Sequence, residues 1–151
     1  MAVLEQGSKA PDFQLKDQDG KIRKLTDYVG KKLLLYFYPR ASTPGCTVQA
    51  CSVRDSAADL DKAGIARVGI SPDTPGSQKK FEQAQALNFP LLCDEDHKVA
   101  EAYGVWGEKK NFGKTVMGII RSSFLIDENG KILGAWYKVS PEDTVPNALN
   151  L

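Results

Sequence analysis

Three cysteines carry the most reactive side chains of this chain of 151 residues, and an odd number does not suit a scaffold of paired disulfides. Cys46 stands in the segment Thr43-Pro44-Gly45-Cys46-Thr47, which follows a run of apolar and aromatic residues. Thr43 suits the N-cap of a helix, and Pro44 suits the first helical position, where its missing N–H costs no hydrogen bond. The pattern predicts a helix that begins at Pro44 and carries Cys46 in its first turn.

A thiol in the first turn of a helix lies near the positive end of the helix dipole and near free backbone N–H groups. Both favour the thiolate, which is the nucleophilic form of cysteine. We expect the side-chain oxygen of Thr43 to meet the amide of Cys46, and Gly45 to leave room for a substrate. The alternative is that Cys46 is only a small apolar residue on the buried side of the helix.

Cys51 lies five residues after Cys46. In an intact helix this spacing places the two Cα atoms about 8–9 Å apart, whereas a disulfide needs Cα atoms within about 7 Å. A bond between them therefore requires at least one helical turn to unwind, which is a local unfolding step. The modest helix formers Gly45, Thr47 and Ser52 make such unwinding easier. The alternative is that Cys51 only contributes to packing.

The elements that position these cysteines are a strand and a helix. The apolar run Leu33–Tyr38 predicts a strand that is buried on both faces and ends at Pro39. The helix is expected over about Pro44–Ala63, with Gly64 as a C-cap residue. Residues at helical spacing predict its buried stripe, which consists of Cys46, Ala50, Val53, Ala57 and Leu60.

The rest of the chain alternates strands and helices. The expected elements are a hairpin of Asp12–Leu15 and Lys21–Leu25, a strand at Ala66–Ile70, a helix at Pro75–Leu87, a strand at Phe89–Leu92, a helix at Glu95–Tyr103, a hairpin of Ser122–Ile126 and Lys131–Tyr137 around Asn129-Gly130, and a last helix from about Pro141. Strands separated by helices imply right-handed crossovers and a largely parallel sheet, with antiparallel edges from the hairpin. We therefore expect an α/β protein with a thioredoxin-like fold, a mixed sheet, an N-terminal hairpin and flanking helices.

Composition and charge limit the class of protein. Hydrophobic residues make up 42% and charged residues 26% of the chain, which predicts one globular domain over residues 1–151. Lys plus Arg is 20 and Asp plus Glu is 19, a balance that argues against nucleic acid or an anionic membrane as the main partner. No apolar run reaches the roughly 18 residues of a membrane span. The start of the chain shows no signal-peptide pattern, so we expect a cytoplasmic protein.

The residues around Cys46 carry a family resemblance. Tyr36–Thr47, followed by Ala50-Cys51 and Arg54-Asp55, closely resembles peroxiredoxins, most of all the branch called peroxiredoxin Q or bacterioferritin comigratory protein. The pattern of Pro39, three residues, Thr43, two residues and Cys46 is highly specific. The resemblance covers nearly the whole chain, and further matching segments are Ala10–Phe13, Asp94–Asp96, Tyr103–Gly107 and Arg121–Asp127.

This resemblance implies a thiol peroxidase that reduces hydrogen peroxide and alkyl hydroperoxides. Cys46 would be the peroxidatic cysteine, and the hydroxyl of Thr43 would orient the peroxide. Pro39 would shield the pocket, and Arg121 would reach the site from a distant part of the chain. Because O–O cleavage builds negative charge on the departing oxygen, helix-start N–H groups and a guanidinium suit these roles.

The resemblance also implies a catalytic cycle without a cofactor or metal. Cys46 would become a sulfenic acid, and Cys51 would condense with it to form an intramolecular disulfide. Thioredoxin or a similar dithiol reductant would then reduce that disulfide by thiol exchange. Some members of the branch keep the second cysteine in the next helix, but Pro75–Leu87 contains none. Members of the branch are often monomers, and we expect a monomer.

Two other kinds of protein are alternatives to a peroxidase. A peroxide-responsive redox sensor or partner-binding module would use the same disulfide as a switch, oxidised once per signal. A general disulfide oxidoreductase usually has two cysteines separated by two residues, which this chain lacks.

Other residues have two interpretations each. Cys93 is expected to end a strand without a catalytic role, although it forms a possible metal-ligand pair with His97. Lys109, Lys110 and Lys114 indicate a solvated loop, or a docking patch for an acidic reductant. Four large apolar residues form either an apolar collar that accepts alkyl hydroperoxides or ordinary core packing. They are Phe37, Trp106, Phe112 and Met117.

Overall fold

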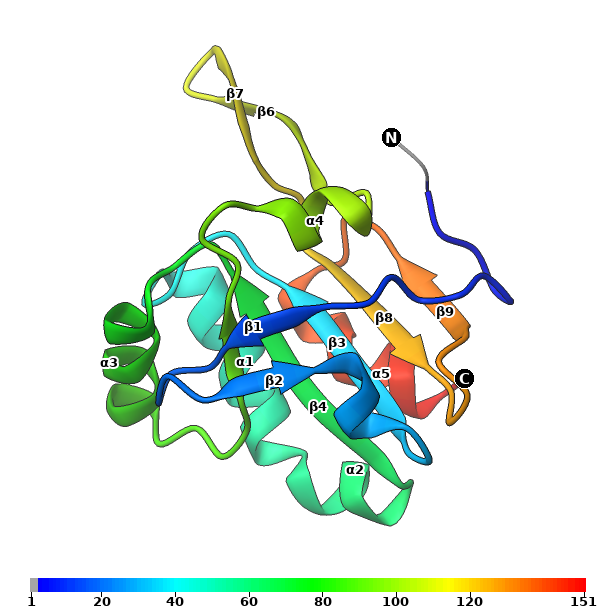
Figure 1. The fold of residues 1–151 in the computed structure, drawn as a ribbon. Coiled ribbons are helices and arrows are strands. Elements are labelled where there is room, and N and C mark those ends of the chain that lie inside the picture. The colour runs from blue at the N-terminus through cyan, green and yellow to red at the C-terminus, as the bar shows by residue number, and fades with distance from the viewer. Residues whose placement is uncertain (1–2) are drawn as a thin grey trace.

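The structure is a computed structural model that describes residues 3–151. Its centre is a seven-stranded sheet in the order β2-β1-β5-β4-β3-β8-β9 (Figure 1). The strands of this sheet are β1 (Gln14–Lys16), β2 (Ile22–Lys24), β3 (Lys32–Phe37), β4 (Ile65–Ser71), β5 (Leu91–Cys93), β8 (Ser122–Ile126) and β9 (Ile132–Trp136). The mixed α/β fold and both predicted hairpins, β1–β2 and β8–β9, are confirmed.

Parallel pairing is confined to the middle of the sheet. β4 pairs in parallel with β3 on one side and β5 on the other, whereas the remaining neighbours are antiparallel. The expectation of a largely parallel sheet is therefore wrong. Only the connections from β3 to β4 and from β4 to β5 contain crossover helices, which parallel neighbours require.

The helices are shorter than the sequence predicts. The structure contains α1 (Pro44–Asp55), α2 (Ala57–Lys62), α3 (Pro75–Gln85), α4 (Lys98–Ala102) and α5 (Thr144–Leu149), with 3-10 turns at Leu25–Tyr28 and Pro141–Asp143. The single helix expected over about Pro44–Ala63 is wrong, because it breaks at Ser56. The amide of Ser56 is shared between the carbonyls of Ser52 and Val53, at 3.1 and 3.2 Å. Asp and Ser side chains compete for backbone hydrogen bonds, so Asp55-Ser56 is a weak point in a helix.

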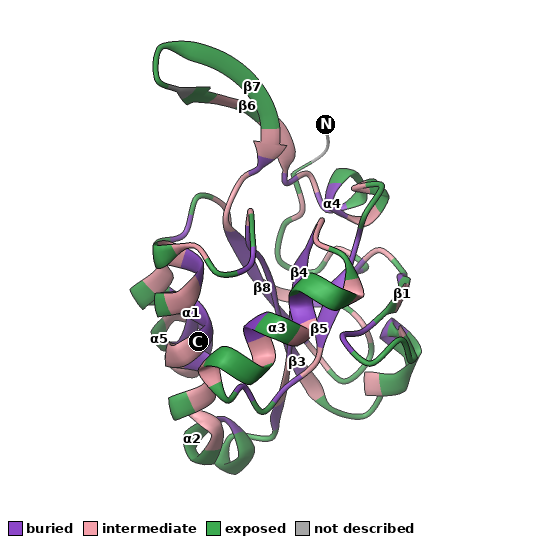
Figure 2. Ribbon diagram, turned by 90° about the vertical axis from the view of Figure 1, so that its left-hand side faces the viewer, coloured by how far each residue is buried: buried purple, intermediate pink, exposed green. Residues whose placement is uncertain are grey.

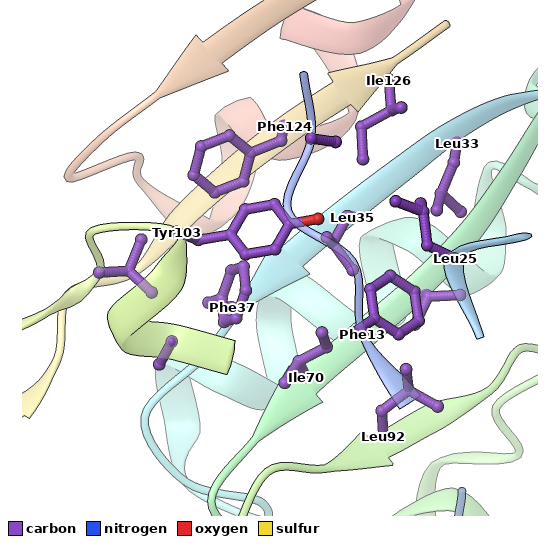
Figure 3. Packing of buried hydrophobic residues seen from close by; sticks show 14 of the residues in the cluster. Phe13, Leu25, Leu33, Leu35, Phe37, Ile70, Leu92, Tyr103, Phe124 and Ile126 are labelled. Atoms are coloured by element: carbon purple, nitrogen blue, oxygen red, sulfur yellow. The ribbon is translucent and has the colours of Figure 1, made fainter. Parts of the chain in front are cut away.

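The core lies on both faces of the sheet, because successive side chains of β3 point to opposite sides. Leu33, Leu35 and Phe37 join a cluster with Phe13, Tyr103 and Phe124 (Figure 3). Leu34 and Tyr36 join a second cluster that receives side chains from α1, α2, α3 and α5. Of the predicted helical stripe, Cys46, Ala50, Val53 and Leu60 are buried in this second cluster. The start of α1 is therefore fixed against the sheet by apolar packing.

A two-stranded ribbon projects from the body of the molecule. It consists of β6 (Trp106–Asn111) and β7 (Lys114–Ile119), which pair with each other and with no strand of the central sheet (Figure 1). Most of β7 is exposed (Figure 2). The expected solvated loop over the lysines is thus a β-ribbon, which we call the arm. In the part of the chain that the structure describes, no helix is long and apolar enough to cross a membrane.

Candidate active site

Cys46 lies in the first turn of α1, as the sequence predicts, and its side chain is 2% exposed. Thr43 is the N-cap and Pro44 the first helical residue. The expected contact between the Thr43 side chain and the Cys46 amide is wrong. The Thr43 hydroxyl instead donates to the carbonyl of Arg40 at 2.8 Å, because the loop turns back on itself before the helix.

Arg121 contacts Cys46 from a segment 75 positions further along the chain. It lies directly before β8, and its Nη2 is 3.4 Å from the Cys46 Sγ. A guanidinium at this distance can stabilise negative charge that develops beside the sulfur during a reaction. Gly45 makes room for this contact, because a Cβ added there would lie 3.0 Å from Arg121 Nη2. The structure therefore brings together two of the predicted site residues that are 75 positions apart.

Gln49 binds the guanidinium of Arg121, and Thr144 binds Gln49 in turn. Neither residue was predicted from the sequence. Arg121 Nη1 donates to Gln49 Oε1 at 2.7 Å, and Gln49 Nε2 donates to Thr144 Oγ1 at 2.8 Å. Gln49 and Thr144 are both 0% exposed. The signal for Gln49 was available, because a residue three positions after Cys46 shares its helix face. Nothing local pointed to Thr144, which is 95 positions from Gln49.

Cys51 lies on the same unbroken helix as Cys46, and both are free thiols. Cys51 is half-buried, and its Sγ lies 3.5 Å from Gln85 Oε1 at the end of α3. Arg54 binds the same stretch, since its Nη1 donates to the carbonyl of Gln85 at 2.5 Å. The second half of α1 is therefore attached to α3, while its first turn carries Cys46.

Pro39 follows β3 closely and is half-buried. It lines a pocket of about 490 Å³ between the loop before α1 and the base of the arm. The other lining residues are Pro72, Trp106, Lys109, Lys110, Val116, Met117, Gly118 and Ile119. Cys46, Thr43 and Arg121 do not line this pocket.

The structure does not gather the expected apolar collar. Phe37 belongs to the core and is 0% exposed, whereas Phe112 is 100% exposed in the turn of the arm. Trp106 stacks on His97 with ring centroids 3.8 Å apart. Only Trp106 and Met117 share a pocket. Core packing is the correct interpretation for Phe37, and the collar is wrong.

Lys109 is not a solvated loop residue. It is half-buried, and its Nζ donates to the carbonyl of Ile119 at 2.7 Å. Burial, together with the nearby Arg121 guanidinium, lowers the pKa of Lys109. Lys110 and Lys114 are exposed. The base of the arm therefore borders the charged end of the site.

Cys93 is the last residue of β5 and is 6% exposed. Burial raises the pKa of its thiol to about 12 from an ordinary 9.0. A thiol that stays protonated is a poor nucleophile and a poor metal ligand. His97, its possible partner in a metal pair, stacks on Trp106, and its Nδ1 lies 3.5 Å from Glu101 Oε2. Within residues 3–151, no three His, Cys, Asp or Glu side chains are grouped so that they could hold a metal ion.

A buried cysteine at the start of a helix, in contact with an arginine 75 positions further along the chain, agrees with the comparison to known families. The model of the AhpC/TSA family matches residues 6–135. The chain belongs to this family and is a peroxiredoxin, an enzyme that reduces peroxides with electrons from a thiol reductant.

Two bacterial relatives are similar over most of their length. Peroxiredoxin Bcp of Escherichia coli is 55% identical over 132 residues, which are 87% of this chain and 85% of the relative. Peroxiredoxin Bcp of Bacillus subtilis is 49% identical over 147 residues, 97% of this chain and 94% of the relative. A solved structure of the bacterioferritin comigratory protein of Xanthomonas campestris has a TM-score of 0.87 and 35% identity, and covers 99% of this chain and 96% of its own. Together they confirm the resemblance to the peroxiredoxin Q branch.

Proposed function

We propose that Cys46 attacks the peroxide and that Arg121 stabilises the charge that develops during the attack. The observation that carries this proposal is the 3.4 Å contact between Arg121 Nη2 and Cys46 Sγ at the start of α1. The thiolate sulfur attacks the terminal peroxide oxygen, and the O–O bond breaks. The departing hydroxide or alkoxide takes up a proton and leaves as water or alcohol. Cys46 remains as a sulfenic acid.

Thr43 and Pro39 complete the proposed site. The hydroxyl of Thr43 already donates to the carbonyl of Arg40, so its oxygen is left to accept a hydrogen bond from the peroxide. Pro39 has no backbone N–H and lies at the end of a buried strand, so it limits the access of water without adding a competing donor. The Arg121 guanidinium supplies fixed hydrogen-bond donors where negative charge develops, and such donors lower the activation barrier of O–O cleavage.

The second half of the proposed cycle uses Cys51. Its thiol condenses with the Cys46 sulfenic acid, which forms the disulfide and releases water. Because both residues lie on one unbroken helix, the first turns of α1 must unwind before the sulfurs meet. A dithiol reductant then reduces the disulfide, and we propose thioredoxin for this step. This makes the protein an atypical two-cysteine enzyme that works as a monomer in the cytoplasm.

The proposed substrates are hydrogen peroxide and alkyl hydroperoxides. The relative from Xanthomonas campestris is described as having alkyl peroxide reduction activity. In this chain the pocket beside Pro39 offers apolar lining from Trp106 and Met117 to a substrate larger than hydrogen peroxide.

The test is a single turnover. Fully reduced protein receives one equivalent of hydrogen peroxide, the remaining thiols are counted over time, and any disulfide is mapped by peptide mass. We expect fast loss of two thiols and a bond between Cys46 and Cys51, with the same result in the Cys93→Ser variant. A bond between Cys46 and Cys93 would overturn the role of Cys51. Absence of fast thiol loss would overturn the role of Cys46.

Repeated turnover separates the enzyme from a sensor. With thioredoxin, thioredoxin reductase and NADPH, an enzyme consumes NADPH for as long as peroxide is supplied. A protein that uses the disulfide only as a switch is oxidised once and then stops. Sustained consumption is the expected outcome.

A further inference from the structure

The loop from Pro39 to Thr43 joins β3 to α1 and forms neither helix nor strand. Its backbone makes a sharp turn at Ser42, which has a φ of +65°. Residues with a Cβ rarely adopt this conformation, and they keep it only where the surrounding structure holds them. The loop also sets the start of α1, and with it the position of Cys46.

One side chain from outside holds this loop. Asp73, just after β4, accepts the backbone N–H of Ala41 on its Oδ2 at 2.7 Å. The same oxygen accepts the hydroxyl of Ser71 at 2.6 Å. Within residues 3–151, this is the only hydrogen bond to the backbone of residues 39–43 from a side chain outside the loop and α1. Hydrogen bonds to a charged acceptor are among the stronger ones in proteins.

The carboxylate of Asp73 is itself fixed by a buried network. Ser71 Oγ accepts from Gln78 Nε2 at 2.8 Å, and Gln78 Oε1 accepts from the Tyr38 hydroxyl at 2.5 Å. Ser71, Gln78 and Tyr38 are all 0% exposed. The network therefore connects the loop to β4, to α3 and to the end of β3. A buried network in which each member has a partner is rigid.

We propose that Asp73 is a positioning residue that holds the loop before α1 in the folded, peroxide-reactive arrangement. The proposal rests on the function proposed above for Cys46 and Cys51. With the bond from Ala41 to Asp73 in place, Cys46 stays in the first turn of α1 and faces Arg121. When the bond opens, the loop and first turn unwind, and Cys46 can reach Cys51.

Asp73 therefore sets the choice between two fates of the Cys46 sulfenic acid. In the folded arrangement a second peroxide oxidises it to the sulfinic acid, with transfer of one oxygen and release of water or alcohol. In the unwound arrangement the Cys51 thiol condenses with it, the disulfide forms and water leaves. A weaker anchor favours the disulfide at the expense of the sulfinic acid.

Rapid-mixing kinetics of the whole protein test this proposal in two variants. In Asp73→Ala we expect the rate constant for reaction with hydrogen peroxide to fall about tenfold, because a charged hydrogen-bond acceptor is lost. We expect the ratio of sulfinic acid to disulfide under excess peroxide, measured by intact mass, to fall about tenfold as well. Asp73→Asn keeps an oxygen acceptor, so it should restore most of both quantities.

Asp127→Ala is the matched control. Asp127 is also half-buried, and its Oδ1 also accepts two hydrogen bonds, from the amides of Asn129 and Lys131. It lies in the turn between β8 and β9. This variant should lose thermal stability without a change in either kinetic quantity.

The outcomes separate this proposal from the proposed function. If the unaltered protein itself forms no disulfide between Cys46 and Cys51, the proposed function fails. If it does form one, and Asp73→Ala lowers thermal stability while the sulfinic acid ratio stays unchanged, Asp73 is only structural and the positioning role is overturned. A shifted ratio in Asp73→Ala, with partial return in Asp73→Asn, supports the positioning role.

Discussion

The absence of a side chain at Gly45 leaves room for the guanidinium of Arg121. A Cβ there would stand 3.0 Å from Arg121 Nη2, the atom that contacts the sulfur of Cys46. Since the arginine would have to shift by a few tenths of an ångström, the guanidinium would leave the position that its contact with Gln49 defines.

Gly45→Ala should therefore separate catalysis from stability. We expect the rate constant for reaction with peroxide to fall about tenfold, since small misplacements of charged groups are costly in catalysis. The free energy of unfolding should not fall, because alanine is favoured over glycine in a helix by about 0.5–1 kcal/mol. Stopped-flow kinetics and denaturant unfolding measure the two quantities.

Gly76→Ala provides the control for this substitution. Gly76 follows Thr74-Pro75 at the start of α3, just as Gly45 follows Thr43-Pro44. A Cβ at Gly76 would meet only Thr74 Oγ1, at 3.9 Å. If Gly76→Ala lost as much peroxide reactivity as Gly45→Ala, the loss could not be attributed to contact between a Cβ at position 45 and Arg121.

Cys93 should behave as an inert thiol until high pH. Burial holds its pKa at about 12, above an ordinary 9.0, so the thiol is protonated in the folded protein at neutral pH. Iodoacetamide at pH 8 should label Cys93 only after unfolding, as peptide mass would show. Because the unfolded thiol ionises first, the stability contributed by Cys93 is complete below pH 9 and is lost as pH rises toward 12. Cys93→Ser should flatten this alkaline decline in denaturant midpoint, and an equal decline would contradict the assignment.

At the scale of elements, α5 supports α1 through a polar contact across the core. Thr144 Oγ1 accepts from Gln49 Nε2, and Gln49 Oε1 accepts from Arg121 Nη1. The C-terminal helix thus takes part in orienting a side chain from the segment before β8. Its contribution acts through two hydrogen bonds, with no direct contact to the sulfur.

Thr144→Val should reveal this support. Valine fills nearly the same volume but leaves the buried Gln49 Nε2 without its acceptor, which costs about 1–3 kcal/mol. We expect a fall of about fivefold in the rate constant with peroxide as Gln49 reorients. Ser123→Ala is the control, since the buried Ser123 hydroxyl has no hydrogen-bond partner among the described residues. Equal effects of the two variants would show that α5 does not act through Gln49.

The sequence predicts those elements whose signals are local. Thr43-Pro44 marks the start of α1, and Asn129-Gly130 marks the turn between β8 and β9, as the structure confirms. The break at Ser56 was missed because the apolar stripe continues through it to Leu60, so periodicity alone could not find it. Long-range contacts were out of reach of local patterns. The position of Arg121 was expected only from a family resemblance, and its support by Thr144 was not expected at all.

At the scale of the whole molecule, the arm carries two exposed lysines: Lys110, which lines the pocket beside Pro39, and Lys114, which does not line it. Phe112 in its turn is fully exposed. The hypothesis that these lysines dock an acidic protein reductant predicts an electrostatic effect on the encounter with that reductant alone.

A charge reversal tests this hypothesis. Lys110→Glu with Lys114→Glu should raise the KM for thioredoxin severalfold and weaken its dependence on salt. Turnover supported by dithiothreitol, a small uncharged dithiol, should be unchanged. Lys31→Glu with Lys62→Glu makes the same change of charge on two other exposed residues. Each precedes the N-terminal end of its strand, β3 or β4, whereas Pro39 follows the C-terminal end of β3. If this second pair raises the KM equally, total charge and not the arm governs the encounter.

The break at Ser56 has a consequence for how the molecule opens. α1 and α2 are separate helices, and Leu60 of α2 is fully buried against the sheet. If α1 unwinds from Pro44, as the proposed cycle requires, the unwinding meets a boundary at Ser56 before it reaches α2. We therefore expect the amide protons around Cys46 to exchange through a sub-global opening and those of α2 to exchange only when the whole domain unfolds, which hydrogen-exchange measurements would check. The single non-helical residue Ser56 would thus let a segment that opens and a segment that stays folded lie next to each other in the chain.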